Sequence, residues 1–152
     1  AARVGQIAAA EFGSEPLDLV IDDASHLLDE TTASFNVLFP RLRPGGAFVI
    51  EDWSSELERE RAFAHQLRAN PEANEALARR LETEGFPPPP PPPLGRLILE
   101  LVLAAGYNNG AIGQITEIRG GWMVVERGPA DLDPGSFDIS EWCGPFGGNL
   151  LT

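Results

Sequence analysis

The sequence predicts an α/β fold with parallel strands and a C-terminal antiparallel hairpin, and three observations support this. Two short apolar runs, residues 17–23 and 47–52, each end in acidic residues. Apolar residues on both faces are typical of strands in a parallel sheet. About 24 residues separate the runs, which is enough for one crossover helix, and such crossovers are almost always right-handed. Two later strands, 111–118 and 122–127, are joined by Arg119-Gly120-Gly121, which is a hairpin signal.

The first half of the chain is expected to alternate helix and strand. Residues 2–12 predict a short helix, which Gly13-Ser14-Glu15-Pro16 interrupts. A second helix can be capped within residues 29–32 and runs to about Arg43. Pro44-Gly45-Gly46 is expected to end this helix before the second strand begins. Apolar side chains recur along one face of the helix, as in a helix packed on a core: Phe35, Leu38, Phe39 and Leu42.

The second half begins with a polar helical stretch. Residues 55–84 are rich in Glu, Arg and Ala and are divided by Pro71. Seven consecutive prolines follow at 87–93, and they predict a stiff polyproline II segment because proline fits neither helix nor strand interiors. This segment is either a surface linker or a docking motif for proline-binding domains. A strongly apolar helix is expected over residues 94–105, before the hairpin.

The length and the net charge of the chain limit the kinds of protein that it can be. At 152 residues we expect one domain, spanning 1–128 with the proline run inside it, followed by a loop-like tail at 129–152. The net charge of −12 argues against nucleic-acid partners, because phosphate backbones would be repelled. Every basic residue is Arg, which with abundant Ala, Gly and Pro is typical of GC-rich bacterial genomes.

Location can also be inferred from the sequence. No apolar run approaches the roughly 20 residues of a membrane span, so we expect no membrane association. No N-terminal stretch has the layout of a signal peptide. The single cysteine, Cys143, fits a reducing cytoplasm, and no histidine lies near it at the spacing of a nucleophilic motif.

Four residues at the ends of the two parallel strands form the candidate site. Asp23 and His26 follow the first strand, and Glu51 and Asp52 end the second. Neighbouring strands lie about 5 Å apart, so three carboxylates would meet at one edge of the sheet and repel each other. A hard divalent cation such as Mg²⁺ resolves that repulsion. His26 could then act as a general base on a substrate oxygen held there.

Each candidate also has a purely structural interpretation. Asp22 and Asp23 could cap the following turn, His26 could be an ordinary loop histidine, and Glu51-Asp52 could be solvated strand-end charges. The joint pattern is more specific than its parts and favours the site. Trp53 could line a pocket or pack in the core, and His65 is expected at the surface of the charged helical stretch.

Residues 17–53, LDLVIDDASHLLDETTASFNVLFPRLRPGGAFVIEDW, resemble the core of the macrolide sugar O-methyltransferases of the macrocin and mycinamicin type. This resemblance implies a Rossmann-like class I methyltransferase fold. In that family the Asp of D-x-x-H and the acidic pair of I-E-D bind Mg²⁺, which implies Asp23, Glu51 and Asp52 as ligands. The family histidine that deprotonates a sugar hydroxyl matches His26.

The resemblance also implies an activity. A methyl group would pass from S-adenosylmethionine to a hydroxyl of a small molecule, in antibiotic biosynthesis. No glycine-rich cofactor loop precedes Leu17, so we expect the C-terminal half of such an enzyme, with the first strands missing. Ala24 and Ser25, in the turn after the first strand, are the expected cofactor contacts.

Two other functions stay open. One is a truncated or non-catalytic α/β module that keeps a metal or an interaction role. The other is a metal-assisted hydrolase that uses the same carboxylates. A sheet that lacks strands would expose apolar edges, so we also expect self-association, with a homo-oligomer as one form of it.

Overall fold

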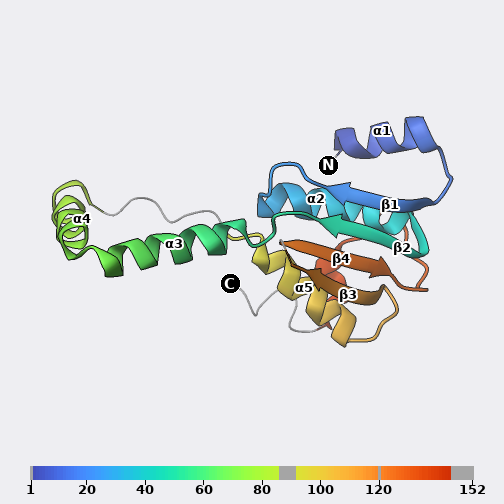
Figure 1. Ribbon diagram of the computed structural model, residues 1–152. Coiled ribbons are helices and arrows are strands. Elements are labelled where there is room, and N and C mark those ends of the chain that lie inside the picture. The colour runs from blue at the N-terminus through green and yellow to red at the C-terminus, as the bar shows by residue number, and fades with distance from the viewer. Residues whose placement is uncertain (1, 86–91, 120, 145–152) are drawn as a thin grey trace.

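The protein is described by a computed structural model over residues 2–85, 92–119 and 121–144. Four strands form one sheet in the order β1-β2-β4-β3 (Figure 1). They are β1 (Leu17–Asp22), β2 (Leu42–Ile50), β3 (Ile112–Ile118) and β4 (Trp122–Arg127). β1 and β2 are parallel, whereas β4 is antiparallel to both β2 and β3. The predicted α/β fold, with its parallel pair and its hairpin, is therefore confirmed.

The helices divide into a packed group and an arm. α1 (Ala2–Phe12), α2 (Leu28–Leu38) and α5 (Gly95–Gly106) lie beside the sheet, while α3 (Ser55–Ala69) and α4 (Pro71–Glu84) project away from it (Figure 1). Asn70 separates the two arm helices, and its Oδ1 accepts a hydrogen bond from Ala73 N–H at 3.1 Å. Proline is tolerated at the first position of a helix, so Pro71 divides the stretch as predicted. No helix in these described ranges is both long and apolar enough to cross a bilayer.

The core lies between the sheet and helices α2 and α5. Phe35 of α2 and Phe39, just after that helix, stack with ring centroids 4.4 Å apart, and Phe35 also meets Phe48 of β2 at 4.9 Å. Such pairs stabilise a core beyond their buried area. On the same face of the sheet, α5 contributes fully buried side chains, including Leu97 and Leu101.

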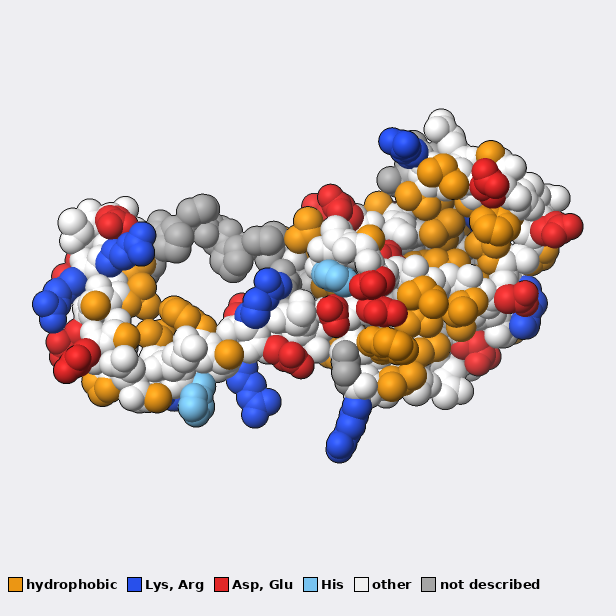
Figure 2. All heavy atoms as spheres, turned by 45° about the horizontal axis from the view of Figure 1, so that its top comes forward, with side chains coloured by type: hydrophobic (Ala, Val, Ile, Leu, Met, Phe, Trp, Pro, Cys, Tyr) orange, Lys and Arg blue, Asp and Glu red, His pale blue; other side chains and the backbone are white. Residues whose placement is uncertain are grey.

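The opposite face of the sheet is apolar but largely exposed. The strand register aligns Ile21, Val49 and Val124 in one row across three strands. Ile21 is 56% exposed, and Trp122 at the end of β4 is 44% exposed. Figure 2 shows hydrophobic side chains gathered over this part of the molecule. Parallel strands are normally covered on both faces, so this surface is unusual for the fold.

The boundary between α2 and β2 differs from the prediction. α2 ends at Leu38, a 3₁₀ turn covers Phe39–Arg41, and β2 already begins at Leu42. Pro44-Gly45-Gly46 therefore lies inside the strand rather than before it. The pairing shows why: Leu17 opposes Leu42 and Leu19 opposes Ala47, so the extra residues of β2 form a bulge. Bulges accept proline and glycine where a regular ladder does not.

Gly46 occupies the tightest point of this bulge. A Cβ atom built there would lie 2.9 Å from the carbonyl oxygen of Arg43 and 3.1 Å from that of Asp18. Both contacts are with backbone, which cannot rotate out of the way. The close approach of β1 and β2 at this point thus depends on a residue without a side chain.

Two predicted segments fall partly outside the described ranges. Of the expected polyproline segment, only Pro92 and Pro93 are described, directly before α5. The tail was expected to be loop-like, and its described part, 129–144, contains one 3₁₀ turn, Ile139–Trp142. Ile139 and Cys143 are fully buried in the core. The described part of the tail therefore belongs to the same packed unit as the sheet.

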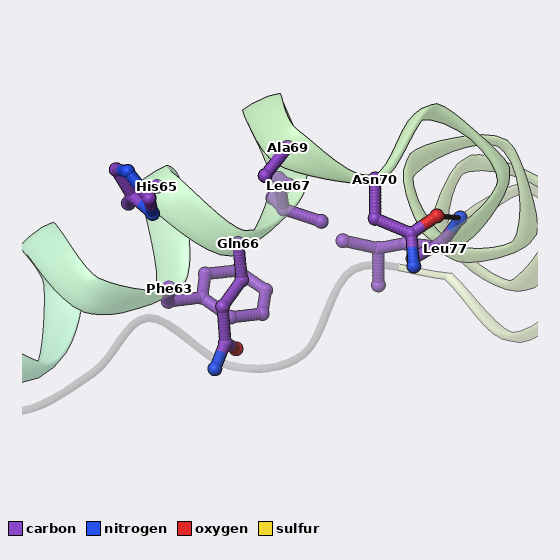
Figure 3. Close-up of a pocket in the computed structure, with 8 residues that line it drawn as sticks. Phe63, His65, Gln66, Leu67, Ala69, Asn70 and Leu77 are labelled. Atoms are coloured by element: carbon purple, nitrogen blue, oxygen red, sulfur yellow. Dashed lines mark hydrogen bonds between the residues drawn. The ribbon is translucent and has the colours of Figure 1, made fainter.

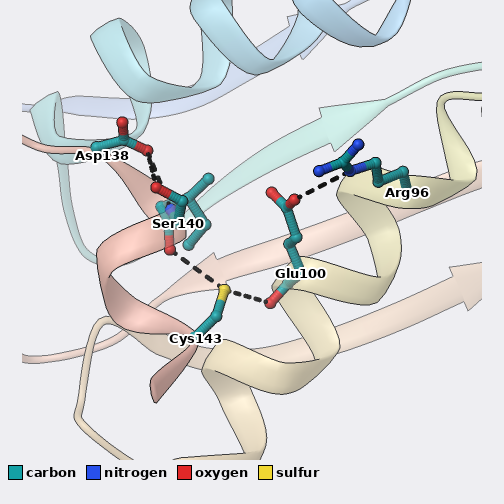
Figure 4. Close-up of polar contacts among 6 residues, drawn as sticks. Arg96, Glu100, Asp138, Ser140 and Cys143 are labelled. Atoms are coloured by element: carbon teal, nitrogen blue, oxygen red, sulfur yellow. Dashed lines mark hydrogen bonds and ion pairs between the residues drawn. The ribbon is translucent and has the colours of Figure 1, made fainter. Parts of the chain in front are cut away.

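Cys143 joins this tail to α5. Its Sγ lies 3.1 Å from the carbonyl oxygen of Glu100 and 3.3 Å from that of Ile139 (Figure 4). Glu100 also pairs through its carboxylate with Arg96, at 3.6 Å. Burial is the main cause that raises the pKa of the Cys143 thiol to about 11. The thiol is protonated at neutral pH, which agrees with the prediction that it is not a nucleophile.

Candidate active site at the ends of the parallel strands

The parallel pair places the predicted site residues at one edge of the sheet. Asp22 is paired with Ile50, and Glu51 N–H donates a hydrogen bond to the carbonyl oxygen of Asp22 at 3.0 Å. The chain therefore leaves both strands at the same level. Asp23 follows one strand and Glu51 and Asp52 follow the other, at the carboxyl edge where open α/β sheets bind ligands.

His26 connects the two strand ends. Its Nδ1 lies 3.2 Å from the carbonyl oxygen of Glu51, and its Nε2 lies 3.8 Å from Oδ1 of Asp23. A carbonyl oxygen can only accept, so Nδ1 carries the proton in this bond. That tautomer leaves the Nε2 lone pair free to accept a proton, and 29% of the His26 side chain is exposed.

The turn that carries His26 has an unusual backbone. His26 has a φ of 56°, in the left-handed region that non-glycine residues rarely adopt. Asp52, at the end of the second strand, also has a left-handed φ, of 52°. Such strained conformations persist only where the surrounding structure holds them in place, and they are found mostly at active sites and ligand sites. Here the contact between His26 and Glu51 is one such restraint.

Asp22 precedes this turn. The sequence suggested only that its side chain could cap the turn. Its Oδ1 accepts a hydrogen bond from Ala24 N–H at 3.3 Å, so the capping interpretation is confirmed for this residue. The residue is buried, and its Oδ2 has no hydrogen-bond partner within the described ranges. An unpaired buried carboxylate oxygen is costly. Asp22 therefore offers a free lone pair at the base of the candidate site.

The predicted cofactor contacts lie in the same turn. Ala24 is exposed, and Ser25 is half-buried, with its Oγ accepting a hydrogen bond from Leu27 N–H at 3.4 Å. Both positions are thus accessible beside Asp23 and His26. Their contact with a cofactor stays a prediction.

The predicted metal ligands share an edge but do not form a ligand set. Across the described ranges, no three His, Cys, Asp or Glu side chains are arranged to hold a metal ion. Asp23 is 64% exposed, and Asp52 is also exposed. The chemistry of the donors still fits a hard cation, because all are carboxylate oxygens and the Asp22 Oδ2 is unpaired beside them. The assignment of Asp23, Glu51 and Asp52 as ligands stays a prediction.

A hollow of about 570 Å³ opens beside His26. Its other walls come from the start of α3 and include Glu58 and Arg59. Figure 2 shows a histidine beside acidic side chains where the arm joins the sheet. These two charged residues were not singled out from the sequence, where they look like any exposed pair on a polar helix.

Another cavity, of about 470 Å³, lies between the two arm helices (Figure 3). Phe63, Leu67 and Leu77 supply much of its wall, and among the described residues no carboxylate lines it. His65 is at its margin and is exposed, as predicted. The described residues that line this cavity include no group suited to catalysis.

Comparison with known proteins gives matches over part of the chain. Demethylmacrocin O-methyltransferase of Streptomyces fradiae is 52% identical over 48 residues, which is 31% of this chain and 12% of that protein. Mycinamicin VI 2''-O-methyltransferase of Micromonospora griseorubida is 54% identical over 41 residues, covering 26% and 10% of the two chains. The matched segments thus span only a small fraction of these relatives. No family model matches the chain.

Among solved structures, the MycE methyltransferase from the mycinamycin pathway, in complex with Mg and SAH, is similar with a TM-score of 0.46 and 29% identity. The match covers 84% of this chain and 29% of that one. A MycE complex that also holds mycinamycin VI gives a TM-score of 0.47 at 27% identity. The sequence matches confirm the resemblance predicted from residues 17–53: over part of its length, this chain is similar to the sugar O-methyltransferases of the macrocin and mycinamicin type.

Proposed function

We propose that this chain is part of an S-adenosylmethionine-dependent, Mg²⁺-assisted O-methyltransferase that acts on a sugar hydroxyl of a small natural product. The observation that carries the proposal is the position of His26, which contacts the ends of both parallel strands. The relatives add support, because they are O-methyltransferases named for macrolide and tetracenomycin glycosides. Each match covers only a small part of a relative, so methyl transfer by this chain is proposed from the site and the matches together.

His26 would act as the general base. Its Nδ1–H is bound to a backbone carbonyl, so Nε2 is the atom that would take the proton from the attacking hydroxyl. The carboxylate of Asp23, 3.8 Å from Nε2, would stabilise the imidazolium that forms. Both groups are accessible from solvent, as a bound substrate would require.

The three strand-end carboxylates would hold the cation. When bound, Mg²⁺ lowers the pKa of a coordinated hydroxyl and fixes its orientation. Asp23, Glu51 and Asp52 would be its protein ligands, and Ala24 and Ser25 would contact the methyl donor. The hollow between His26 and α3 would admit the acceptor.

Metal binding provides the first test. Mg²⁺ and Mn²⁺ are titrated into the chain by calorimetry and compared with Asp23→Asn and with Glu82→Gln on α4. We expect Asp23→Asn to weaken binding by about tenfold or more, as loss of one charged ligand does. Glu82→Gln should bind like the unmodified chain. Equal, weak binding by all three would remove the metal from the proposal.

A second candidate is a non-catalytic module of the same fold. The observation in its favour is that no metal-ligand set is formed by side chains in the described ranges. Calorimetry with S-adenosylmethionine tests one side of this choice. Heat of binding from a folded chain supports the enzyme, whereas no heat fits either the module or a fragment of the enzyme.

A further inference from the structure

We propose that the arm formed by α3 and α4 binds the arm of a second copy of this chain, so that the two arms form a dimer contact. The arm projects from the sheet, and its two helices pack mainly against each other (Figure 1). No arm side chain that the structure describes is buried. Helices of 15 and 14 residues are marginal in water unless packing covers an apolar face. Within the described ranges, nothing supplies that cover.

The cavity between the two helices, called the arm notch below, is the apolar surface that a partner would cover. Phe63 and Leu67 lie one helical turn apart on α3, and Leu77 lines the notch from α4 (Figure 3). Phe63 is 53% exposed. Gln66 and Asn70 add polar groups to the lining. An exposed apolar patch beside polar residues is typical of a surface that binds another protein.

The distribution of charge favours an arm as the partner of an arm. Residues 55–84 contain seven Glu and five Arg, which gives a net charge of −2, whereas the rest of the chain carries −10. Two surfaces of strong like charge repel each other. The nearly neutral arm is therefore the part of this acidic chain at which two copies meet with the least repulsion, and its projection from the sheet keeps the acidic parts of the two copies apart.

Unpaired charges on the two arm helices complement each other. On α4 both arginines have ion pairs within the helix, so Glu72 and Glu82 remain without one in the described ranges. On α3, Arg59, Arg61 and Arg68 have no ion pair among the described residues. Packing of α3 of one copy against α4 of the other matches these charges, and a two-fold axis makes the same contact twice. Exposed pairs add little affinity, but they select the orientation of the contact.

The arm is large enough for a stable contact. At 1.5 Å per residue, helices of 15 and 14 residues are about 22 and 21 Å long. Half the surface of two such cylinders, each about 11 Å across, is roughly 700 Å². A standard protein interface buries about 800 Å² on each partner. One face of the arm therefore approaches the area that a stable dimer needs.

Pairing of the arms would also fix one wall of the candidate site. The start of α3 contributes Glu58 and Arg59 to the hollow beside His26. A helix that a second copy holds at its far end keeps these side chains at a constant distance from the histidine. This inference goes beyond the methyltransferase proposal and does not depend on it.

Sedimentation velocity over a range of concentrations tests the contact in the full chain. All variants carry Ile21→Glu, which removes association through the open sheet face. We expect a dimer, and Phe63→Glu or Leu77→Glu should weaken it by about tenfold or more, because the contact would bury an unpaired charge. Leu57→Glu is the matched control, because Leu57 is on the same helix as Phe63, is 44% exposed and does not line the arm notch. It should stay within about twofold.

Glutamate forms helices at least as well as phenylalanine, so loss of the dimer would not reflect loss of the α3 helix. A monomer at every concentration would overturn the proposal. So would equal weakening of the dimer by Phe63→Glu and Leu57→Glu.

Energy transfer between copies locates the contact without any change in the arm notch. Donor-labelled and acceptor-labelled chains are mixed, with dyes on Ala76→Cys in α4 or on Gln114→Cys in β3, both of which are exposed positions. Transfer should be strong between the α4 labels and weak between the β3 labels. The reverse order would place the contact on the sheet and overturn the proposal. This measurement stays decisive even where a glutamate variant fails to fold.

The two proposals fail in different ways. Asp23→Asn should dimerise like the unmodified chain, because Asp23 lies at the sheet edge and not on the arm. A chain that dimerises through its arms but binds no metal keeps this inference and loses the Mg²⁺-assisted mechanism. A chain that binds metal but remains a monomer loses only the arm contact.

Discussion

The Nδ1 atom of His26 lies 3.2 Å from the carbonyl oxygen of Glu51, so the imidazole that follows one strand is held by the backbone of the next. A backbone acceptor cannot be removed by changing the Glu51 side chain. The orientation and tautomer of His26 therefore do not depend on the Glu51 carboxylate, which is one of the three proposed to bind the cation.

Replacement of His26 tests the proposed base. In the intact enzyme, His26→Ala should lower the rate of methyl transfer by about 10²–10⁴-fold, which is the usual contribution of a general base. Binding of Mg²⁺ should change little, since the carboxylates remain. His65→Ala is the control, because His65 is exposed on the arm and should not affect the rate. Unchanged turnover of His26→Ala would exclude this histidine as the base.

Gly46 should be intolerant of a side chain. Gly46→Ala places a Cβ against three backbone carbonyl oxygens, and such overpacking typically costs about 1–3 kcal/mol. Gly106→Ala is the contrasting variant, since a Cβ at that helical position meets nothing within 4 Å. It should stabilise the chain by about 0.5 kcal/mol. Urea unfolding measures both changes, and equal midpoints for the two variants would contradict the proposed close approach of β1 and β2.

Glu100 should make stability depend on pH. Burial raises the pKa of its carboxyl, and Asp138 adds to the rise, although the Arg96 ion pair opposes it. The folded chain then holds this proton more tightly than the unfolded chain does. The contribution of the group is fully present below the unfolded pKa, and it is lost as the pH rises through the higher folded pKa.

Glu100→Gln removes that ionisation. The free energy of unfolding of the variant, relative to the unmodified chain, should therefore increase as the pH rises from about 4 to 7. Glu84→Gln, on the exposed arm, should show no such trend beyond the loss of its surface pair with Arg80. A difference between Glu100→Gln and the unmodified chain that is flat across this range would refute the role of Glu100.

The open sheet face should cause self-association. Ile21 and Trp122 are exposed on a surface that is apolar across three strands. Ile21→Glu should lower the apparent mass on size exclusion, because a charge on this face opposes its burial. Val102→Glu, equally exposed on α5, should not change the mass. A clean monomer of the unmodified chain at high concentration would contradict the prediction.

Local patterns were sufficient to predict much of this fold. The two acid-terminated apolar runs gave the correct parallel pair, and Arg119-Gly120-Gly121 gave the correct hairpin. The failure at Pro44-Gly45-Gly46 has a tertiary cause. These residues are helix breakers locally, but β1 pairs with both ends of the segment and draws it into the strand as a bulge. No window confined to residues 29–46 contains that information.

The sequence predicted where the backbone places the candidate site residues, but not the burial or the neighbours of their side chains. The sequence places Asp23, His26, Glu51 and Asp52 at one edge, because parallel strands end together. It does not show that Asp22 is buried with an unpaired oxygen, since burial depends on what packs above the strand. Nor does it bring Glu58 and Arg59 beside His26, because that depends on the direction in which α3 leaves the sheet.

The buried Cys143 thiol also has a practical consequence. With its pKa raised to about 11, and with no lysine in the chain, the folded protein presents neither a reactive sulfur nor a side-chain amine to common labelling reagents. A cysteine introduced at an exposed position of α4 would therefore be modified selectively by a maleimide dye. Distances from that dye to a second label on the sheet would test whether the arm changes position when a substrate binds.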